Sequence, residues 1–182
     1  MRELIPAFRF LAIFVGLYFG LNLLYGLWIY SYGTQVDAAT SAVTRQSSVL
    51  LNLFGEKTSI ALKLSSPSIS ILNPSGVVVN VFEGCNGLNV MIVFVAFLFA
   101  FSEQKKKITW FLPLGLLIIY IANIGRVMAL YYVAEYWKAY FYYVHKYVLT
   151  AFLYALVFVL WWFWIEKISG ISLRNVTLSK QS

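Results

Sequence analysis

Long apolar stretches alternate with polar segments along the chain, and four of them have the length of a membrane-spanning helix. Crossing roughly 30 Å of hydrocarbon takes about 20 helical residues. The four stretches cover about residues 8–30, 84–102, 108–134 and 145–165. Arg126 lies well inside the third, whereas the other charges lie near the ends of their stretches. The pattern predicts an all-α polytopic membrane protein built as a four-helix transmembrane bundle.

The segment between the first two stretches, residues 31–82, follows a different pattern. Asp37 is typical of a helix N-cap and Gly55 of a helix stop, so we expect a helix along the membrane surface between them. Three segments with the alternation or Val content of strands follow, at 58–64, 68–72 and 76–82. The turn sequence at 73–76 separates the last two. We therefore expect a small extracytoplasmic cap made of a surface helix plus a β-hairpin.

The spans and the cap together form a single predicted membrane-embedded domain, residues 1–167, followed by a polar cytoplasmic tail at 168–182. A cleaved secretory signal peptide is the alternative for the first stretch, because Val36-Asp37-Ala38 offers small residues for cleavage. The apolar run exceeds the usual length of a signal-peptide core, so we favour a retained span.

Composition excludes several classes of protein. Hydrophobic residues make up 61% of the 182 positions and charged residues only 12%, about half the share of a soluble domain. A soluble fold of this size cannot hide so much apolar surface. A soluble enzyme, a disordered regulator and a fibrous repeat are all disfavoured.

The charge balance indicates orientation rather than nucleic-acid binding. The net charge is +7, and the basic residues flank the apolar runs. Basic residues are densest in the N-terminal segment, at 105–107 and after 166. By the positive-inside rule both termini are then cytoplasmic and the cap faces outward. We expect a multi-pass protein of the cytoplasmic (inner) membrane that contacts lipid and no nucleic acid.

Three residues stand out as candidates for chemistry. Arg126 is costly within an apolar run unless it has a partner or water, and Cys85 and His145 are the one cysteine and the one histidine. Helical rise from the cytoplasmic lysines to each of them is about 30 Å. The three residues therefore reach the same level near the outer face, from three different spans, and can meet there. A single cysteine forms neither an internal disulfide nor a Cys-rich zinc site, so we expect no cofactor and no metal.

These residue types fit nucleophilic catalysis. A thiolate is a good nucleophile, and a helix N-terminus at Cys85 favours negative charge. His145 is the expected acid and base, and Arg126 stabilises either the thiolate or an oxyanion. Asn123, on the same helix face as Arg126, is expected to orient the guanidinium, and Glu83 to pair with Arg126 or to hold His145.

Each residue also has a structural interpretation. A lone cysteine is often only a small buried hydrophobe, and a histidine near an interface often only caps or snorkels. The aromatic runs are expected to be interfacial belts.

The segments Glu83-Gly84-Cys85-Asn86-Gly87 and Asn123-Ile124-Gly125-Arg126, followed by His145, resemble the exosortase/archaeosortase family of membrane cysteine transpeptidases. The resemblance covers about residues 82–165 and implies a catalytic set of Cys85, Arg126 and His145. Family members commonly carry Ser or Thr after the cysteine, where this chain has Asn86, which we count as a supporting residue with Glu83 and Asn123. Many relatives also have more than four spans.

The resemblance implies a function for the chain. An exosortase-like cysteine peptidase or transpeptidase would cleave the C-terminal transmembrane sorting signal of an exported client at the outer membrane face, through a Cys85 thioester. It would then transfer the client to an acceptor, in a system tied to protein sorting and extracellular polysaccharide. Two alternatives stay open: a non-catalytic membrane scaffold or assembly subunit, and a thiol-dependent acyltransferase.

Overall fold

The computed structural model describes residues 5–63, 66–101 and 105–168. Its regular helices and strands are, in chain order, α1 (Ile5–Ser31), α2 (Ala38–Leu53), β1 (Ser59–Lys63), β2 (Ser68–Asn73), β3 (Gly76–Phe82), α3 (Leu88–Phe101), α4 (Lys105–Tyr136), α5 (Phe141–Tyr143) and α6 (Leu149–Phe163). Short 3-10 or π-helical turns join or extend them at Glu83–Cys85 (η2), Lys138–Tyr140 (η3), Val144–Val148 (η4) and Trp164–Ile168 (η5).

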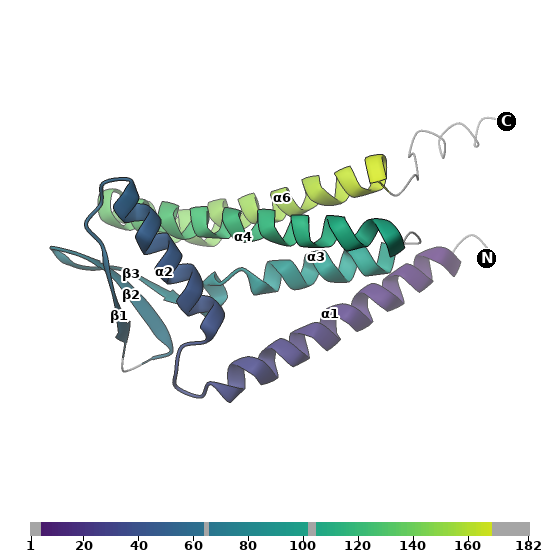
Figure 1. Cartoon of the computed structure of the whole chain (residues 1–182), viewed down its shortest axis with the longest axis horizontal. Coiled ribbons are helices and arrows are strands. Elements are labelled where there is room, and N and C mark those ends of the chain that lie inside the picture. Colours follow the sequence, from purple (N-terminus) through teal and green to yellow (C-terminus); the bar gives the residue numbers. More distant parts are fainter. Residues whose placement is uncertain (1–4, 64–65, 102–104, 169–182) are drawn as a thin grey trace.

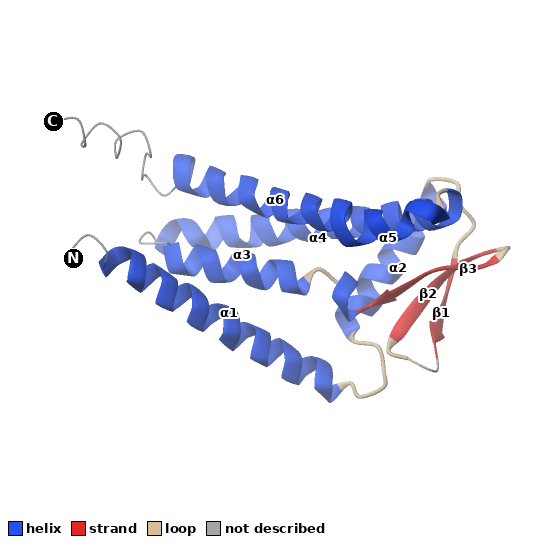
Figure 2. Cartoon of the chain, turned by 180° about the vertical axis from the view of Figure 1, so that it is seen from behind, coloured by secondary structure: helices blue, strands red, loops and turns tan. Residues whose placement is uncertain are grey.

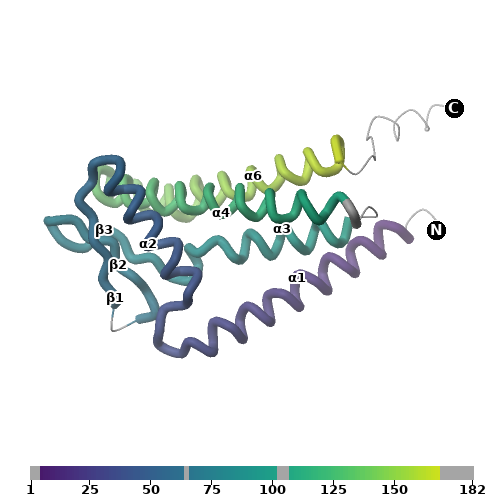
Figure 3. The backbone as a smooth tube through the Cα atoms, viewed as in Figure 1, coloured from purple at the N-terminus to yellow at the C-terminus, as the bar shows by residue number. Residues whose placement is uncertain are grey.

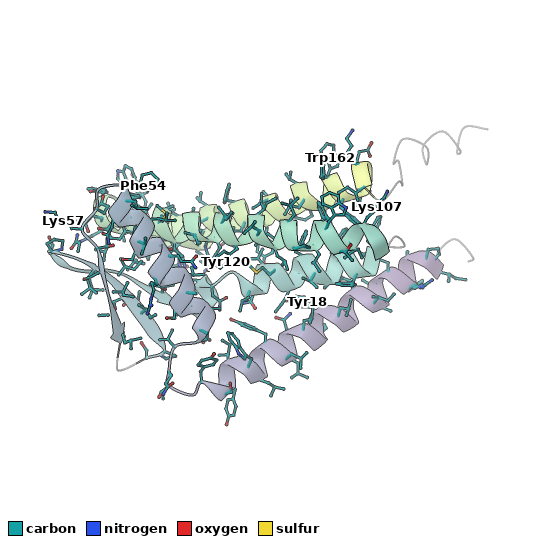
Figure 4. All side chains as sticks on the ribbon, viewed as in Figure 1. Tyr18, Phe54, Lys57, Lys107, Tyr120 and Trp162 are labelled. Carbon is teal, nitrogen blue, oxygen red and sulfur yellow. The ribbon has the colours of Figure 1, made fainter. Side chains whose placement is uncertain are left out.

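The molecule is an elongated helical bundle with a cap at one end (Figure 1). Helices α1, α3, α4 and α6 run along the long axis, and the start of α1 and the end of α6 both lie at the end away from the cap. Helix α2 and the three strands form the cap, which is clearest from behind (Figure 2). The backbone tube shows α1 leading to the cap and the later helices α3, α4 and α6 running between the cap and the opposite end (Figure 3). Side chains of Lys107 and Trp162 mark the end near the termini, and Phe54 and Lys57 the cap (Figure 4).

The predicted four-helix transmembrane bundle is not confirmed. Among the described residues, three helical stretches are long and apolar enough to cross a membrane: Ile5–Ser31, Lys107–Tyr136 and Lys138–Ile168. The second predicted span, residues 84–102, forms only the 14-residue helix α3. The backbone of Glu83–Cys85 is a 3-10 turn and Gly87 has a φ of +82°, so the helix begins at Leu88 instead of residue 84. The chain is a mostly helical membrane protein with three candidate spans and a small sheet.

The bundle core consists of apolar side chains from α3, α4 and α6. Phe94 of α3, with no exposed surface, lies against the backbone of α4 at Gly115, where an added Cβ would fall 2.3 Å from its ring. The rings of Phe97 and Trp161 stack at 4.0 Å between α3 and α6. Helix α1 packs along α3 and has no fully buried residue. Its outer face is apolar and packs against no other described element. Such a surface fits lipid contact.

Helix α2 begins and ends where the sequence predicts, but it does not simply lie along a surface. Asp37 Oδ1 accepts a hydrogen bond from the Thr40 N–H at 2.8 Å, which satisfies a free donor of the first turn. Gly55, with a φ of +96°, ends the helix. The inner face of α2 is buried against the sheet and α4, and includes Val43 and Leu51.

The cap carries a three-stranded antiparallel sheet in the order β1-β2-β3. The prediction of a two-stranded β-hairpin therefore omitted one strand. The hairpin itself is the β2–β3 pair, turning where the Asn73–Gly76 sequence predicts. Strand β1 adds to the far edge of β2 although every one of its residues is exposed. The register of the β2–β3 pair shifts between Ile71 and Leu72, where Val78 of β3 is the extra residue of a bulge.

The fourth predicted span begins seven residues earlier than residue 145. The helical stretch starts at Lys138 and continues to Ile168 through α5, two π-helical turns and α6. The aromatic run at 140–143 contains no helix breaker, so the helix extends through it. Apart from Ile168, the predicted tail at 168–182 lies outside the described residues.

Candidate active site

A tight turn between β3 and α3 carries the candidate nucleophile. After Phe82 the chain forms the 3-10 turn Glu83–Cys85, and the Asn86 Oδ1 then accepts a hydrogen bond from the Leu88 N–H at 2.9 Å. Asparagine here supplies the side-chain acceptor that starts a helix, a task that Ser and Thr also perform. Position 87 requires glycine for two reasons: its φ is positive, and a Cβ would lie 2.9 Å from Asn123 Cγ.

Cys85 and His145 lie in contact. The Sγ of Cys85 is 3.8 Å from Nε2 of His145, a sulfur–nitrogen distance compatible with a hydrogen bond between them. The two residues are sixty positions apart and come from different elements, as the depth argument predicts. Cys85 is 3% exposed and belongs to the apolar core that joins the cap to α4.

His145 is part of a π-helical turn and is supported from both sides. It lies in Val144–Val148, and π-turns within helices are frequent at functional sites. The Phe141 ring stacks on the imidazole with centroids 5.7 Å apart, and the Thr150 hydroxyl donates to the His145 carbonyl at 3.2 Å. The histidine therefore lies inside the helix rather than opening it. The contact with Phe141 was absent from the sequence-based prediction, although four-residue spacing on a helix is a signal for it.

Helix α4 brings Asn123 and Arg126 to the same region. Both side chains are buried, and the Arg126 Nε has no hydrogen-bond partner among the described residues. The positive charge of Arg126 acts on both Cys85 and His145. The Asn123 amide donates to the Cys85 carbonyl at 2.9 Å rather than to the guanidinium, because Gly87 leaves room for it against the turn. Asn123 thus holds the backbone of the nucleophile, a contact different from the predicted one.

Glu83 and Asn86 contact helix α1 through Tyr25. The Asn86 amide donates to the Tyr25 hydroxyl at 3.0 Å, and that hydroxyl lies 3.4 Å from the Glu83 carbonyl. Within the described ranges, no ion pair joins Glu83 to Arg126 and no hydrogen bond joins it to His145. Tyr25 was not singled out from sequence, because a tyrosine in an apolar span carries no local signal of its partner.

Opposing effects act on the Cys85 thiol. Burial raises the pKa of Cys85 above its ordinary value, while the Arg126 charge and a hydrogen bond from the Phe82 backbone N–H lower it. Burial is the largest of the three. The thiol is therefore protonated in the resting site, and its ionisation depends on a neighbouring base and on Arg126.

A cavity of about 210 Å³ opens beside the thiol. Its lining comes from β3, the turn, α4 and α5 with its π-helical extension: Val78, Val79, Asn80, Val81, Phe82, Cys85, Val127, Leu130, Phe141 and His145. Both the sulfur-bearing residue and the imidazole reach the same space. A ligand in this cavity would meet the nucleophile and its base together.

One of the comparisons with known proteins identifies the family of the chain. The family model described as transmembrane exosortase matches residues 6–167 of the 182-residue chain. No curated protein and no solved structure matches the chain. The family match confirms the resemblance carried by the segments around Cys85, Arg126 and His145, and it extends that resemblance through α1 and the cap. Because the match covers far more than half of its length, the chain belongs to the transmembrane exosortase family.

Proposed function

We propose that this chain is a cysteine transpeptidase or protease that cleaves the C-terminal sorting signal of exported client proteins through a thioester on Cys85. The observation that carries the proposal is the 3.8 Å contact between Cys85 Sγ and His145 Nε2, beside a cavity and a buried Arg126. Membership of the exosortase family supports the class of reaction.

In the first step Cys85 attacks a peptide carbonyl of the client. The thiol proton passes to His145 Nε2 as the S–C bond forms, giving a tetrahedral intermediate. The intermediate collapses when the peptide C–N bond breaks, and His145 returns the proton to the leaving amine. The released fragment is the C-terminal helix with its new amino terminus, and the client remains as a thioester on Cys85.

In the second step a nucleophile resolves the thioester. An acceptor amine attacks the thioester carbonyl, loses its proton to His145 and leaves the client joined through a new amide, while the sulfur regains a proton. Water in the same position would give a free carboxylate. The acceptor thus decides between transpeptidation and hydrolysis.

Arg126 is the electrostatic component of the proposed site. A buried guanidinium without a carboxylate partner is costly. In the part of the chain that the structure describes, Arg126 has no such partner and its Nε carries no hydrogen bond. Negative charge that develops on the sulfur or on the carbonyl oxygen reduces this cost. Arg126 therefore stabilises the reacting state more than the resting one, which is the requirement for catalysis.

The same proposal includes location and partner. Both described chain ends lie at the end of the bundle away from the cap, which supports cytoplasmic termini and an outward-facing site in the cytoplasmic membrane (Figure 1). The basic residues near the termini favour the same orientation. A client anchored by its own C-terminal helix would then reach the site by lateral diffusion.

The test is client processing in cells that carry Cys85→Ala, Cys85→Ser, Arg126→Gln or His145→Ala in place of the unaltered chain. Immunoblots with a tag ahead of the client's sorting signal report its size. We expect Cys85→Ala to leave the client full-length and Arg126→Gln to slow processing by about 100-fold or more. Normal processing with Cys85→Ala would refute the proposal.

Mass spectrometry of the Cys85 adduct separates the alternatives. A peptide thioester supports the proposed reaction, and a fatty thioester would replace it with acyl transfer. A chain with Cys85→Ala that still supports surface assembly, with no adduct in the unaltered chain, would favour a scaffold. Because Cys85 is the one cysteine of the chain, every thiol adduct reports this site.

A further inference from the structure

The cavity beside Cys85 runs along the edge of strand β3. Five consecutive residues of the strand, 78–82, line it. Successive side chains of a strand point to opposite faces, so a cavity over one face would touch only alternate residues. A cavity lined by consecutive residues therefore borders the edge of the strand, where its main chain is accessible.

Within the described ranges, this edge of β3 has no strand beside it. The sheet order β1-β2-β3 leaves β3 paired with β2 alone. An edge strand presents N–H and C=O groups that can pair with another extended chain. The opposite wall of the cavity is helical, formed by α4 at Val127 and Leu130 and by Phe141 and His145.

The direction of the unpaired groups follows from a contact across the β2–β3 pair. Asn80 lies directly opposite Ser70, with the bulge only beyond them, and the Ser70 hydroxyl donates to Asn80 Oδ1 at 2.7 Å. Side chains approach most closely in those antiparallel pairs that exchange no main-chain hydrogen bond. We therefore place the Asn80 N–H and C=O on the side of the strand away from β2, toward the cavity that Asn80 lines.

The geometry points to a substrate-docking edge: an extended client peptide, the residues just before the scissile bond, pairs with the free edge of β3 and is carried by it to Cys85. This inference rests on the proposed function and specifies how its substrate binds. Recognition through main-chain hydrogen bonds gives affinity with little dependence on side chains. The apolar wall at Val127 and Leu130 would favour small or apolar side chains in the client.

The direction of the docked peptide is also determined. Strand β3 runs toward the turn that carries Cys85, and α3 then continues into the bundle. The client's own helix follows its scissile bond and must enter the membrane at the same end. The client segment therefore runs parallel to β3, with its N-terminal residues toward Gly76.

The probe is an acetylated tetrapeptide chloromethyl ketone of alanine and valine residues, reacted with the purified full chain in lipid nanodiscs. In this reaction the Cys85 sulfur bonds to the methylene carbon, chloride leaves and the thiol proton goes to His145. Chloroacetamide, which has the same leaving group but no peptide chain, reports the reactivity of the thiol alone. Intact-protein mass spectrometry gives both labelling rates.

The first comparison uses the unaltered chain. We expect the tetrapeptide to label Cys85 about tenfold faster than the same peptide methylated on its backbone nitrogens, since methylation removes the donors for pairing. Equal rates for the two peptides would overturn the proposal without any altered protein.

The second comparison uses Asn80→Pro and Asn80→Ala. Both lose the 2.7 Å hydrogen bond from the Ser70 hydroxyl to Asn80 Oδ1, but only proline removes the outward N–H. We expect the peptide rate of Asn80→Pro to be about tenfold below that of Asn80→Ala, with similar chloroacetamide rates. Equal peptide rates would contradict docking on β3, while loss of client processing in Cys85→Ala would still support the proposed function.

Discussion

The bundle and the cap are stabilised by different means. The bundle core contains apolar side chains and uses close shape matching, such as Phe94 against Gly115, with an apolar surface outside as well as inside. The cap contains buried polar groups that pair locally: Asp37 caps α2, and the Ser48 and Thr58 hydroxyls lie 2.8 Å apart between α2 and the segment before β1. Between helices in lipid, close packing of the side chains is a main determinant of the contact, whereas in the cap polar side chains also pair through directional hydrogen bonds.

The candidate site lies where these two regions meet. Helix α4 contributes Ile119 to the bundle core and Ile124 and Val127 to the core beneath the cap. Asn123 and Arg126 lie in this second section of the helix. A guanidinium and a thiol can stay buried here because the cap covers them, while the cavity that Cys85 lines leaves room for a ligand beside the thiol. The comparison of the two regions shows that the polar residues of the candidate site lie on the cap side of α4, and that the apolar bundle supports them.

The largest effect is expected from overpacking the bundle. Gly115→Ala places a Cβ 2.3 Å from the Phe94 ring, so the ring and α3 must shift. We expect the free energy of unfolding to fall by about 3 kcal/mol. Gly125→Ala on the same helix is the control, since its Cβ meets nothing within 4 Å. Thermal unfolding of both purified variants measures the difference, and an equal Tm would contradict close packing at Gly115.

A smaller effect is expected at the junction. Gly87→Ala combines a positive φ with a Cβ 2.9 Å from Asn123 Cγ, whereas Gly33→Ala has a positive φ in open space. We expect about 2 kcal/mol of destabilisation for Gly87→Ala and about 1 kcal/mol for Gly33→Ala. Only Gly87→Ala should also change the rate at which chloroacetamide labels Cys85. An unchanged labelling rate would show that Asn123 does not hold the nucleophile's backbone.

The next effect concerns the ionisation of the thiol. Because burial raises the pKa of Cys85, its alkylation rate should keep rising with pH beyond the ordinary thiol range of about 8.5. Removing the Arg126 charge destabilises the thiolate, so Arg126→Gln should move the profile to higher pH by about one unit, or tenfold in rate near neutrality. Arg45→Gln, at an exposed position of α2, is the matched control. Coincident profiles for the three proteins would remove Arg126 from the thiol's surroundings.

The smallest effect is expected within the cap. Asp37→Ala removes the acceptor for the Thr40 N–H and should cost about 1 kcal/mol, while Asp37→Asn keeps an acceptor and should cost little. Hydrogen exchange of the first turn of α2 reports the loss locally. If Asp37→Asn were as damaging as Asp37→Ala, the charge rather than the cap geometry would matter.

Local signals predicted much of the fold. A long apolar run is enough to indicate α1 and α4, the N-cap at Asp37 starts α2, and the turn at 73–76 defines the β2–β3 hairpin. Apolarity alone did not reveal that the backbone around Gly87 leaves the helix, so α3 was expected to be too long. Strand β1 was also missed as a sheet member, since all of its residues are exposed and its main chain pairs with β2.

The sequence predicted a common depth for Cys85 and His145 but not the contacts that surround them. Counting helical rise gave Cys85 and His145 a common level. The two residues do lie in contact, although the backbone from Glu83 to Gly87 is not α-helical as the count assumed. Lateral contacts between helices follow from no comparable count. The hydrogen bond from Asn123 to the Cys85 carbonyl and the stacking of Phe141 on His145 depend on how the helices rotate about their axes. The catalytic roles of Cys85, Arg126 and His145 stay predictions.

Only two residues separate Phe82, the last residue of β3, from Cys85, and the turn that contains them is pinned by Asn86 and Asn123. For an extended peptide aligned on that strand, the fixed distance between β3 and the Cys85 sulfur would determine which peptide bond is attacked. Changing the length of the turn by one residue would shift the cleavage position along the client, and the new terminus of the product would record the shift.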